Sequence, residues 1–223
     1  MNSIGNRLER AIALLEKCRN NTLFADIGSD HAHFAIEAVR RGIVKSAIAA
    51  DINEMPLEKG RENSASQGVD IKFVLSDGFE NLENEGITSA AICGMGGELI
   101  AKIILKSETA RHCDLILQPM SQTDELRRAL WDNGFKIDEE VFVTENRKVY
   151  TVMRTFFSGK TTEYTYTDLF LGKERKTGEE FREYCKKVLL SAEKRRIGIV
   201  ARNESTEDID SLIKECQTQI TSF

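Results

Sequence analysis

Residues 23 to 31, Leu-Phe-Ala-Asp-Ile-Gly-Ser-Asp-His, carry the residue types best placed for chemistry in this chain of 223 residues. An apolar run ends at Asp26, Gly28 turns the chain, and apolar residues at helical spacing follow from Phe34 to Val39. This pattern predicts the first strand, turn and helix of a doubly wound α/β domain. Such domains bind their ligands at the carboxyl ends of the strands.

The loop at Gly28 excludes two common ligand classes. It lacks the further glycines of a dinucleotide fingerprint and the Gly-Lys-Ser/Thr of a phosphate loop. An acid before a single tight glycine turn instead suits a ligand that carries an amine and no phosphate. S-adenosylmethionine is such a ligand, since its ammonium can pair with carboxylates.

Three later apolar runs end in residues suited to the rim of the same site. The second run ends at Asp51, 25 residues after Asp26, where an acid can take the two ribose hydroxyls of an adenosine. The third ends at Asp77-Gly78, which could flank an adenine edge, and the fourth ends in the glycine-rich run 94–97. Any single acid at a strand end could be only a cap or turn former. Four strands that alternate with helices and all end in such residues favour a cofactor site at the edge of the sheet where the strands end.

These motifs give the chain a family resemblance. It resembles the bacterial tRNA (adenine-N1)-methyltransferases that modify adenine 22, over about Arg7 to Tyr150. The resemblance rests on four segments: Asp26-Ile-Gly-Ser-Asp-His-Ala, Ala47-Ile-Ala-Ala-Asp51, Gly94-Met-Gly-Gly97 and Ile116-Leu-Gln-Pro119. It implies a Rossmann-like class I methyltransferase that takes S-adenosylmethionine as cofactor and tRNA as partner, with no metal and no membrane association.

Three positions depart from the family pattern. The family has an aromatic residue at His33 and a Leu-Pro where this chain has Phe34-Ala35. The family has a glycine before the proline that follows its second strand, where this chain has Met55 before Pro56. The family also has a Gly-Pro element early in the C-terminal region, where this chain has Leu171-Gly172-Lys173. These departures concern contact with the target base more than cofactor binding.

The motifs and the resemblance together predict the site residues. Cofactor binding is assigned to Asp26, Gly28, Ser29, His31, Asp51, Ile52, Asp77, Gly78, Gly94, Met95 and Gly96. His33 takes the place of the family's aromatic residue, which implies a role in stacking on or orienting the base. Asp30 is expected beside the cofactor or the base. The alternative is that His33 is an exposed histidine near a helix start with no role.

The glycine-rich segment at the end of the fourth apolar run indicates which adenine nitrogen is methylated. Gly94-Met95-Gly96-Gly97 replaces the Asp/Asn-Pro-Pro-aromatic motif expected for methylation of an exocyclic adenine amine. Adenine N1 has an in-plane lone pair, so methyl transfer to it needs alignment more than deprotonation. N1 also lies on the Watson–Crick edge, so the target base must be unpaired or extruded.

Composition indicates a cytoplasmic globular protein. The chain is 41% hydrophobic and 30% charged, enough for one substantial core with an appendage. No apolar run suits a signal peptide or a membrane span. The five cysteines are odd in number and show no Cys-x-x-Cys spacing, so we expect reduced thiols and neither zinc nor disulfides.

The net charge of −5 is unusual for an RNA-binding protein, but the charge is segregated. Residues 182–202 hold seven bases and two acids, a net of +5, and residues 203–217 hold one base and five acids, a net of −4. The candidate phosphate contacts are Lys186, Lys187, Lys194, Arg195 and Arg196. The equally weighted alternative is that these bases pair with the acidic helix beside them.

The elements divide into two predicted domains. Five strand–helix units run to about Gly134, with Ser121 expected to cap the fifth helix. Two β-rich runs, Phe135–Thr144 and Val149–Phe157, then predict an antiparallel hairpin at one edge of a mostly parallel sheet. Apolar residues at helical spacing after 180 predict an antiparallel helical hairpin. We therefore expect a methyltransferase domain over 1–157 and a helical, coiled-coil-like domain over 158–223.

Two rival functions stay open on the sequence. The same scaffold could methylate a small molecule or a protein, because the cofactor half says little about the acceptor. A non-catalytic relative could bind RNA through the helical hairpin, although Asp26, Gly28, Asp51 and Asp77 are all present.

Overall fold

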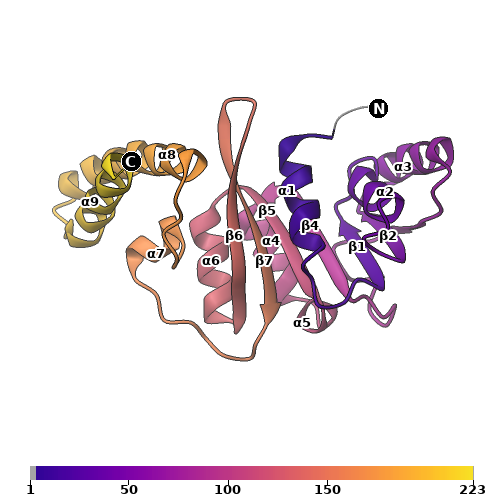
Figure 1. Cartoon of the computed structure of the whole chain (residues 1–223). Helices are drawn as coiled ribbons and strands as arrows, with labels where there is room; N and C mark the ends of the chain where they lie inside the picture. Colours follow the sequence, from indigo (N-terminus) through magenta and orange to yellow (C-terminus); the bar gives the residue numbers. More distant parts are fainter. Residues whose placement is uncertain (1–3, 223) are drawn as a thin grey trace.

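The computed structural model describes residues 4–222 and is built on one seven-stranded sheet (Figure 1). The strand order is β3-β2-β1-β4-β5-β7-β6, with the first five strands parallel and β7 antiparallel to both of its neighbours. The strands are β1 (Leu23–Ile27), β2 (Ser46–Asp51), β3 (Lys72–Leu75), β4 (Ser89–Gly96), β5 (Asp114–Ser121), β6 (Phe135–Glu145) and β7 (Lys148–Phe157). This confirms the predicted mostly parallel sheet with an antiparallel edge hairpin.

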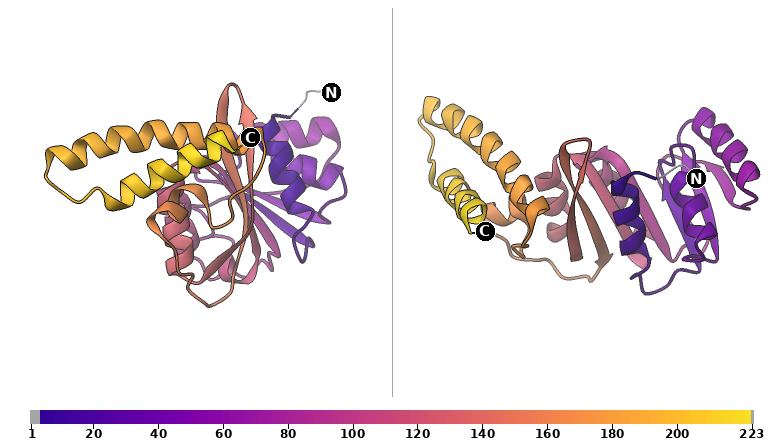
Figure 2. Two further views of the ribbon diagram at one scale, coloured as in Figure 1. Left: turned by 60° about the vertical axis from the view of Figure 1, so that its left-hand side comes forward. Right: turned by 45° about the horizontal axis from the view of Figure 1, so that its top comes forward.

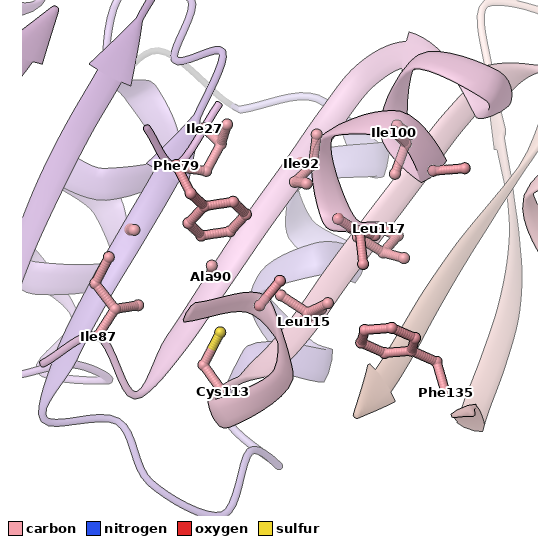
Figure 3. Close-up of a cluster of buried hydrophobic side chains, with 14 of the residues drawn as sticks. Ile27, Phe79, Ile87, Ala90, Ile92, Ile100, Cys113, Leu115, Leu117 and Phe135 are labelled. Atoms are coloured by element: carbon pink, nitrogen blue, oxygen red, sulfur yellow. The ribbon is translucent and has the colours of Figure 1, made fainter. Parts of the chain in front are cut away.

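Helices cover both faces of this sheet because the central strands are apolar on both sides. Helices α1 (Asn6–Leu15), α2 (His33–Arg40) and α3 (Glu54–Gln67) lie on one side. Helices α4 (Gly97–Leu105), α5 (Thr109–His112) and α6 (Thr123–Asp132) lie on the other. Each face of the sheet forms a hydrophobic core with the helices that cover it, and successive strand residues point into opposite cores. Ala90 and Ile92 of β4 pack in the core on the α4–α6 side, and Ala91 packs in the core on the α1–α2 side. Figure 3 shows the first of these cores around Ile92, Leu115 and Leu117.

The structure settles three local details of the predicted elements. Strand β4 does not stop at Cys93 but continues through Gly96, with irregular pairing to β5 around Met95. Helix α6 is preceded by Gln122 in a left-handed conformation with no side-chain cap, so Ser121 is not its cap. Helix α2 begins at His33, and His31 lies in the preceding loop rather than at the helix start.

The C-terminal part consists of α7 (Tyr166–Leu171), α8 (Glu179–Ala201) and α9 (Glu207–Thr221). Helices α8 and α9 pack against each other, as the helical hairpin prediction required, and they lie at the β6 end of the sheet (Figure 2). Their apolar core, which includes Phe181, Tyr184 and Leu212, also contains Phe142 of β6 and Val149 of β7. The sheet therefore shares a core with the C-terminal helices.

A buried ion pair fastens this C-terminal part to the sheet. Arg127 of α6 is fully buried, and its Nη2 lies 2.6 Å from Oε1 of Glu140 on β6. Its Nη1 donates to the backbone carbonyls of Leu169 (2.5 Å) and Phe170 (2.9 Å) at the end of α7. One guanidinium therefore satisfies a carboxylate of the sheet and two carbonyls of a helix terminus.

Replacing Arg127 with leucine should destabilise this junction strongly. The change leaves a buried carboxylate and two carbonyls without their donor, a loss of about 3–5 kcal/mol in unfolding free energy. Urea unfolding would measure it, and the 158–176 segment should become more sensitive to protease. Arg128→Gln on the same helix, where Arg128 is exposed and 3.6 Å from Glu125, should change stability by less than about 0.5 kcal/mol. Equal effects of the two substitutions would contradict the assigned role.

Candidate active site

Asp26 lies in the buried part of β1, one residue before its end, as a carboxylate without a cationic partner among residues 4–222. It is 6% exposed, and its Oδ2 accepts a hydrogen bond of 2.7 Å from the Ser29 hydroxyl. Burial raises the pKa of Asp26 to about 6, and the charges of Asp51 and Asp30 act in the same direction. The Ser29 hydroxyl and the Ala35 N–H oppose that rise. A ligand cation placed here would compensate this carboxylate.

The turn after β1 requires glycine at position 28. Gly28 has a φ of +70°, and a Cβ there would collide with Cε of Met95 from β4. The N–H groups of Gly28 and Ser29 donate to the Ala50 carbonyl at 2.8 and 3.0 Å, which ties the turn to β2. The backbone is therefore held close to the sheet edge where a ligand can approach it.

The rest of the loop places two histidines at the same edge. His31 and Ala32 have left-handed φ values of 61° and 58°, and the His31 carbonyl accepts from Nδ2 of Asn63 at 3.0 Å. His31 Nε2 lies 3.3 Å from Oδ1 of Asp30, and the His31 and His33 rings meet edge to face at 5.9 Å. His33 remains exposed at the start of α2.

A cavity of about 310 Å³, here the Asp26 cavity, opens between this loop and α1. Asp26, Gly28, Asp30, His33 and Gly94 all line it. The structure thus brings together three residues assigned to the cofactor, His33, which was assigned to the target base, and Asp30, which was expected beside the cofactor or the base.

The opposite wall of the Asp26 cavity was not predicted from the sequence. Arg7 Nε of α1 lies 2.5 Å from Oε2 of Glu145, and its Nη1 donates to Oε1 of Gln118 at 3.2 Å. The Arg7 guanidinium also lies over the Tyr150 ring, 4.7 Å from its centroid. Gln118 is 2% exposed, and its Nε2 donates to the Pro119 carbonyl at 2.9 Å. Arg7 and Pro119 therefore fix the orientation of the Gln118 amide.

A second cavity of about 490 Å³, here the Ile52 cavity, lies between the ends of β2 and β3 and helix α4. Ile52, Asp77 and Gly78 line it as predicted, together with Leu99 and Ile103 of α4. Ile52 is 62% exposed and Leu99 is 49% exposed, so both present apolar surface to this cavity.

Five predicted cofactor residues line neither cavity: Ser29, His31, Asp51, Met95 and Gly96. Ser29 supports Asp26, and Met95 covers the Gly28 turn. Asp51 is half-buried at the end of β2, where its Oδ1 accepts the Asn53 N–H at 2.8 Å. Gly96 ends β4 opposite Ser121 of β5.

The candidate RNA contacts have varied partners. Arg196 pairs with Asp210 of the acidic helix at 2.5 Å, whereas Lys186 pairs within its own helix, with Glu183. Arg195 lies 3.5 Å from Asp124 of α6 and over the Phe170 ring. Lys194 and Lys187 form no ion pair within residues 4–222. Pairing with the acidic helix therefore accounts for only one of these five side chains.

Other chemistry finds little support. Burial raises the pKa of the Cys93 thiol, so it stays protonated beside the Asp26 cavity. Within the described part of the chain, no three His, Cys, Asp or Glu side chains group as metal ligands would. None of the helices in that part has the length and apolarity needed to cross a membrane.

The sheet order, the antiparallel edge hairpin and the acids at the strand ends define a class I methyltransferase fold. A family model described as "Methyltransferase domain" matches residues 4–153. A Bacillus subtilis protein named "tRNA (adenine(22)-N(1))-methyltransferase" is 31% identical over 149 residues, which are 65% of this chain and 63% of that protein. The chain belongs to the methyltransferase-domain family, and it spans 63% of the length of the Bacillus subtilis relative.

Two further relatives are similar over more of their length. A Mycoplasma pneumoniae protein named "Putative tRNA methyltransferase" is 31% identical over 153 residues, 67% of this chain and 70% of that one. The crystal structure of Streptococcus pneumoniae Sp1610 in complex with S-adenosyl-L-methionine has a TM-score of 0.78 and 27% identity. The aligned region covers 96% of this chain and 98% of the Sp1610 chain.

Replacing Asp26 with asparagine should stabilise the protein without ligand. The pKa of about 6 in the folded protein lies above the usual aspartate pKa of about 3.8, so ionised Asp26 destabilises the fold above pH 6. At pH 7 the variant should gain about 1–3 kcal/mol in unfolding free energy. The gain should shrink as the pH falls from 7 to 4, because the parent carboxyl then becomes protonated. Urea unfolding at both pH values measures this, and a destabilised variant at pH 7 would refute it.

Proposed function

We propose that the protein transfers a methyl group from S-adenosylmethionine to N1 of an adenine in tRNA, at position 22 as in the Bacillus subtilis relative's name. The observation that carries this proposal is the buried carboxylate of Asp26, which has no cationic partner within residues 4–222 and lines a cavity at the strand ends. The methionyl ammonium of the cofactor would supply the missing charge. Sp1610, a member of the same fold at 27% identity, was crystallised with this cofactor.

The two cavities suit the two ends of the cofactor. Apolar side chains of Ile52 and Leu99 flank the Ile52 cavity and would cover the adenine, with Asp77 and Gly78 at its edge. Asp51, half-buried at the end of β2, would accept the ribose hydroxyls. Gly28 and Gly94 would leave room for the methionyl end near Asp26. The residues present therefore fit this cofactor, which when bound supplies the methyl group from its sulfonium.

The Asp26 cavity also holds groups that suit the target adenine. His33, exposed on its rim, would stack on or orient the base, and Asp30 would lie beside it as a polar neighbour. The N1 lone pair of the base would form the new bond to the methyl carbon while the sulfur–methyl bond breaks and its electrons stay on sulfur as a neutral thioether, so no residue needs to remove a proton first. The methylated base is a cation until its exocyclic amine loses a proton. Positioning is therefore the main task of these side chains.

The basic side chains of α8 support tRNA as the partner. Lys186, Lys187, Lys194, Arg195 and Arg196 are all exposed, around more than one side of the helix, and phosphate contacts dominate the affinity of proteins for nucleic acids. We infer that these side chains hold the tRNA while the target base enters the Asp26 cavity. Five cysteines without a disulfide agree with action in the reducing cytoplasm, where tRNA is found.

The proposal predicts which nucleotide is modified. Unmodified tRNA transcripts incubated with the protein and labelled S-adenosylmethionine should gain N1-methyladenine, mapped by mass spectrometry to one position. Two variants then separate the roles. Asp51→Ala should weaken cofactor affinity about ten- to a hundred-fold, because hydrogen bonds to a charged group are worth about 1.5–3 kcal/mol. His33→Ala should lower turnover and leave cofactor affinity unchanged.

Other outcomes would contradict parts of this account. Methylation of a metabolite extract but not of tRNA would identify another acceptor. Failure to bind the cofactor in calorimetry would favour a non-catalytic relative. Unchanged cofactor affinity in Asp51→Ala would remove Asp51 from the site, and unchanged turnover in His33→Ala would leave that histidine without a role.

A further inference from the structure

The turn between β6 and β7 carries two cations, Arg147 and Lys148, that form no ion pair within residues 4–222. Both side chains are exposed. Most of the other arginines that the structure describes hold a carboxylate, as Arg7 and Arg154 do on either side of this hairpin. The tip of the hairpin therefore presents uncompensated positive charge.

The backbone conformation of this turn is unfavourable for Arg147. Asn146 and Arg147 have φ values of 50° and 62°, the left-handed conformation of a two-residue hairpin turn. Glycine is the residue usually found at the second position of such a turn, and a side chain there is strained. Strained positions cluster at functional sites, so an arginine at this position indicates a role for its side chain.

A third cation is packed against the same turn. Lys187 of α8 donates from Nζ to the carbonyl of Val149, the residue after Lys148, at 3.2 Å. Burial lowers the pKa of Lys187, and the charge of Lys148 lowers it further. The Lys187 ammonium thus contacts the residue next to Lys148 in the chain, so an anion at this turn would meet positive charge from both β7 and α8.

The position of these cations links the catalytic cavity to α8. Glu145, on the same turn, lines the Asp26 cavity. On the other side, Lys187 borders a groove of about 260 Å³ between the end of β5 and α8, which Ser121, Gln122 and Arg195 also line. Figures 1 and 2 show the tip rising above the sheet between α1 and α8.

We propose that Arg147, Lys148 and Lys187 form a phosphate site that holds the tRNA backbone beside the target adenine. A guanidinium binds phosphate oxygens in pairs and an ammonium binds them as a point charge, so the set suits a backbone phosphate. This proposal rests on the proposed function, because it names the surface that receives the same substrate. It extends the RNA contacts from α8 to an element that also lines the catalytic cavity.

The test uses the full chain with Arg147→Gly and Lys148→Gln together. Glycine relieves the strained turn, so the melting temperature should equal or exceed that of the parent, and cofactor affinity should not change. tRNA affinity should fall, and the slope of log affinity against log salt should decrease by about two. Over a four-fold rise in salt the parent should then lose about 16-fold more affinity than the variant.

The control removes two exposed cations that also lack acidic partners within residues 4–222, Lys45 and Lys160. Lys45→Gln with Lys160→Gln should keep the parental slope. The phosphate site is overturned if the tip variant keeps the parental affinity and slope, or if the control changes both equally. If either result is obtained while the unmodified protein still methylates tRNA, the proposed function remains supported and only the phosphate site is overturned. A parent that neither binds nor methylates tRNA overturns both proposals.

Discussion

The main electrostatic constraint at the carboxyl ends of the strands is the buried carboxylate of Asp26, which has no counter-charge among residues 4–222. Asp26 lies on β1, between β2 and β4, where the surrounding strands exclude water. A hydroxyl from Ser29 compensates it only in part, so its ionised form is costly. The arrangement is favourable once a ligand brings an ammonium group. Under the proposed function, the ammonium group of the cofactor supplies that opposite charge.

The β6–β7 hairpin connects this site to the rest of the molecule. Its tip carries Glu145, which holds Arg7 of α1 and so forms one wall of the Asp26 cavity. Lower on the same strand, Glu140 holds Arg127 and, through it, the end of α7. Phe142 is shared with the core of α8 and α9. A single edge hairpin thus positions both one wall of the Asp26 cavity and the helices proposed to hold tRNA.

The parts that were predictable from sequence are those fixed by local patterns. Apolar runs ending at Asp26 and Asp51 identified strands of the sheet, because buried parallel strands are apolar on both faces. The contacts of Arg7 with Gln118 and Glu145 join residues more than 100 positions apart, and no local pattern marks them. Met95 also could not be placed, because its contact with Gly28 depends on the irregular end of β4. Helix α7 is six residues long, too short for periodicity to reveal it.

The most direct test of the role of Asp26 is calorimetry of S-adenosylmethionine binding at pH 6 in buffers of different ionisation enthalpy. At that pH the free carboxyl is partly protonated, whereas an α-amino group, with a pKa of about 8, is already charged. Pairing with the ammonium should ionise Asp26 fully and release up to about half a proton per ligand. The account predicts a binding enthalpy that depends on the buffer at pH 6, and not at pH 8 once any protonation of the ligand amine is subtracted. A buffer-independent enthalpy at pH 6, or the same dependence in Asp26→Asn, would contradict it.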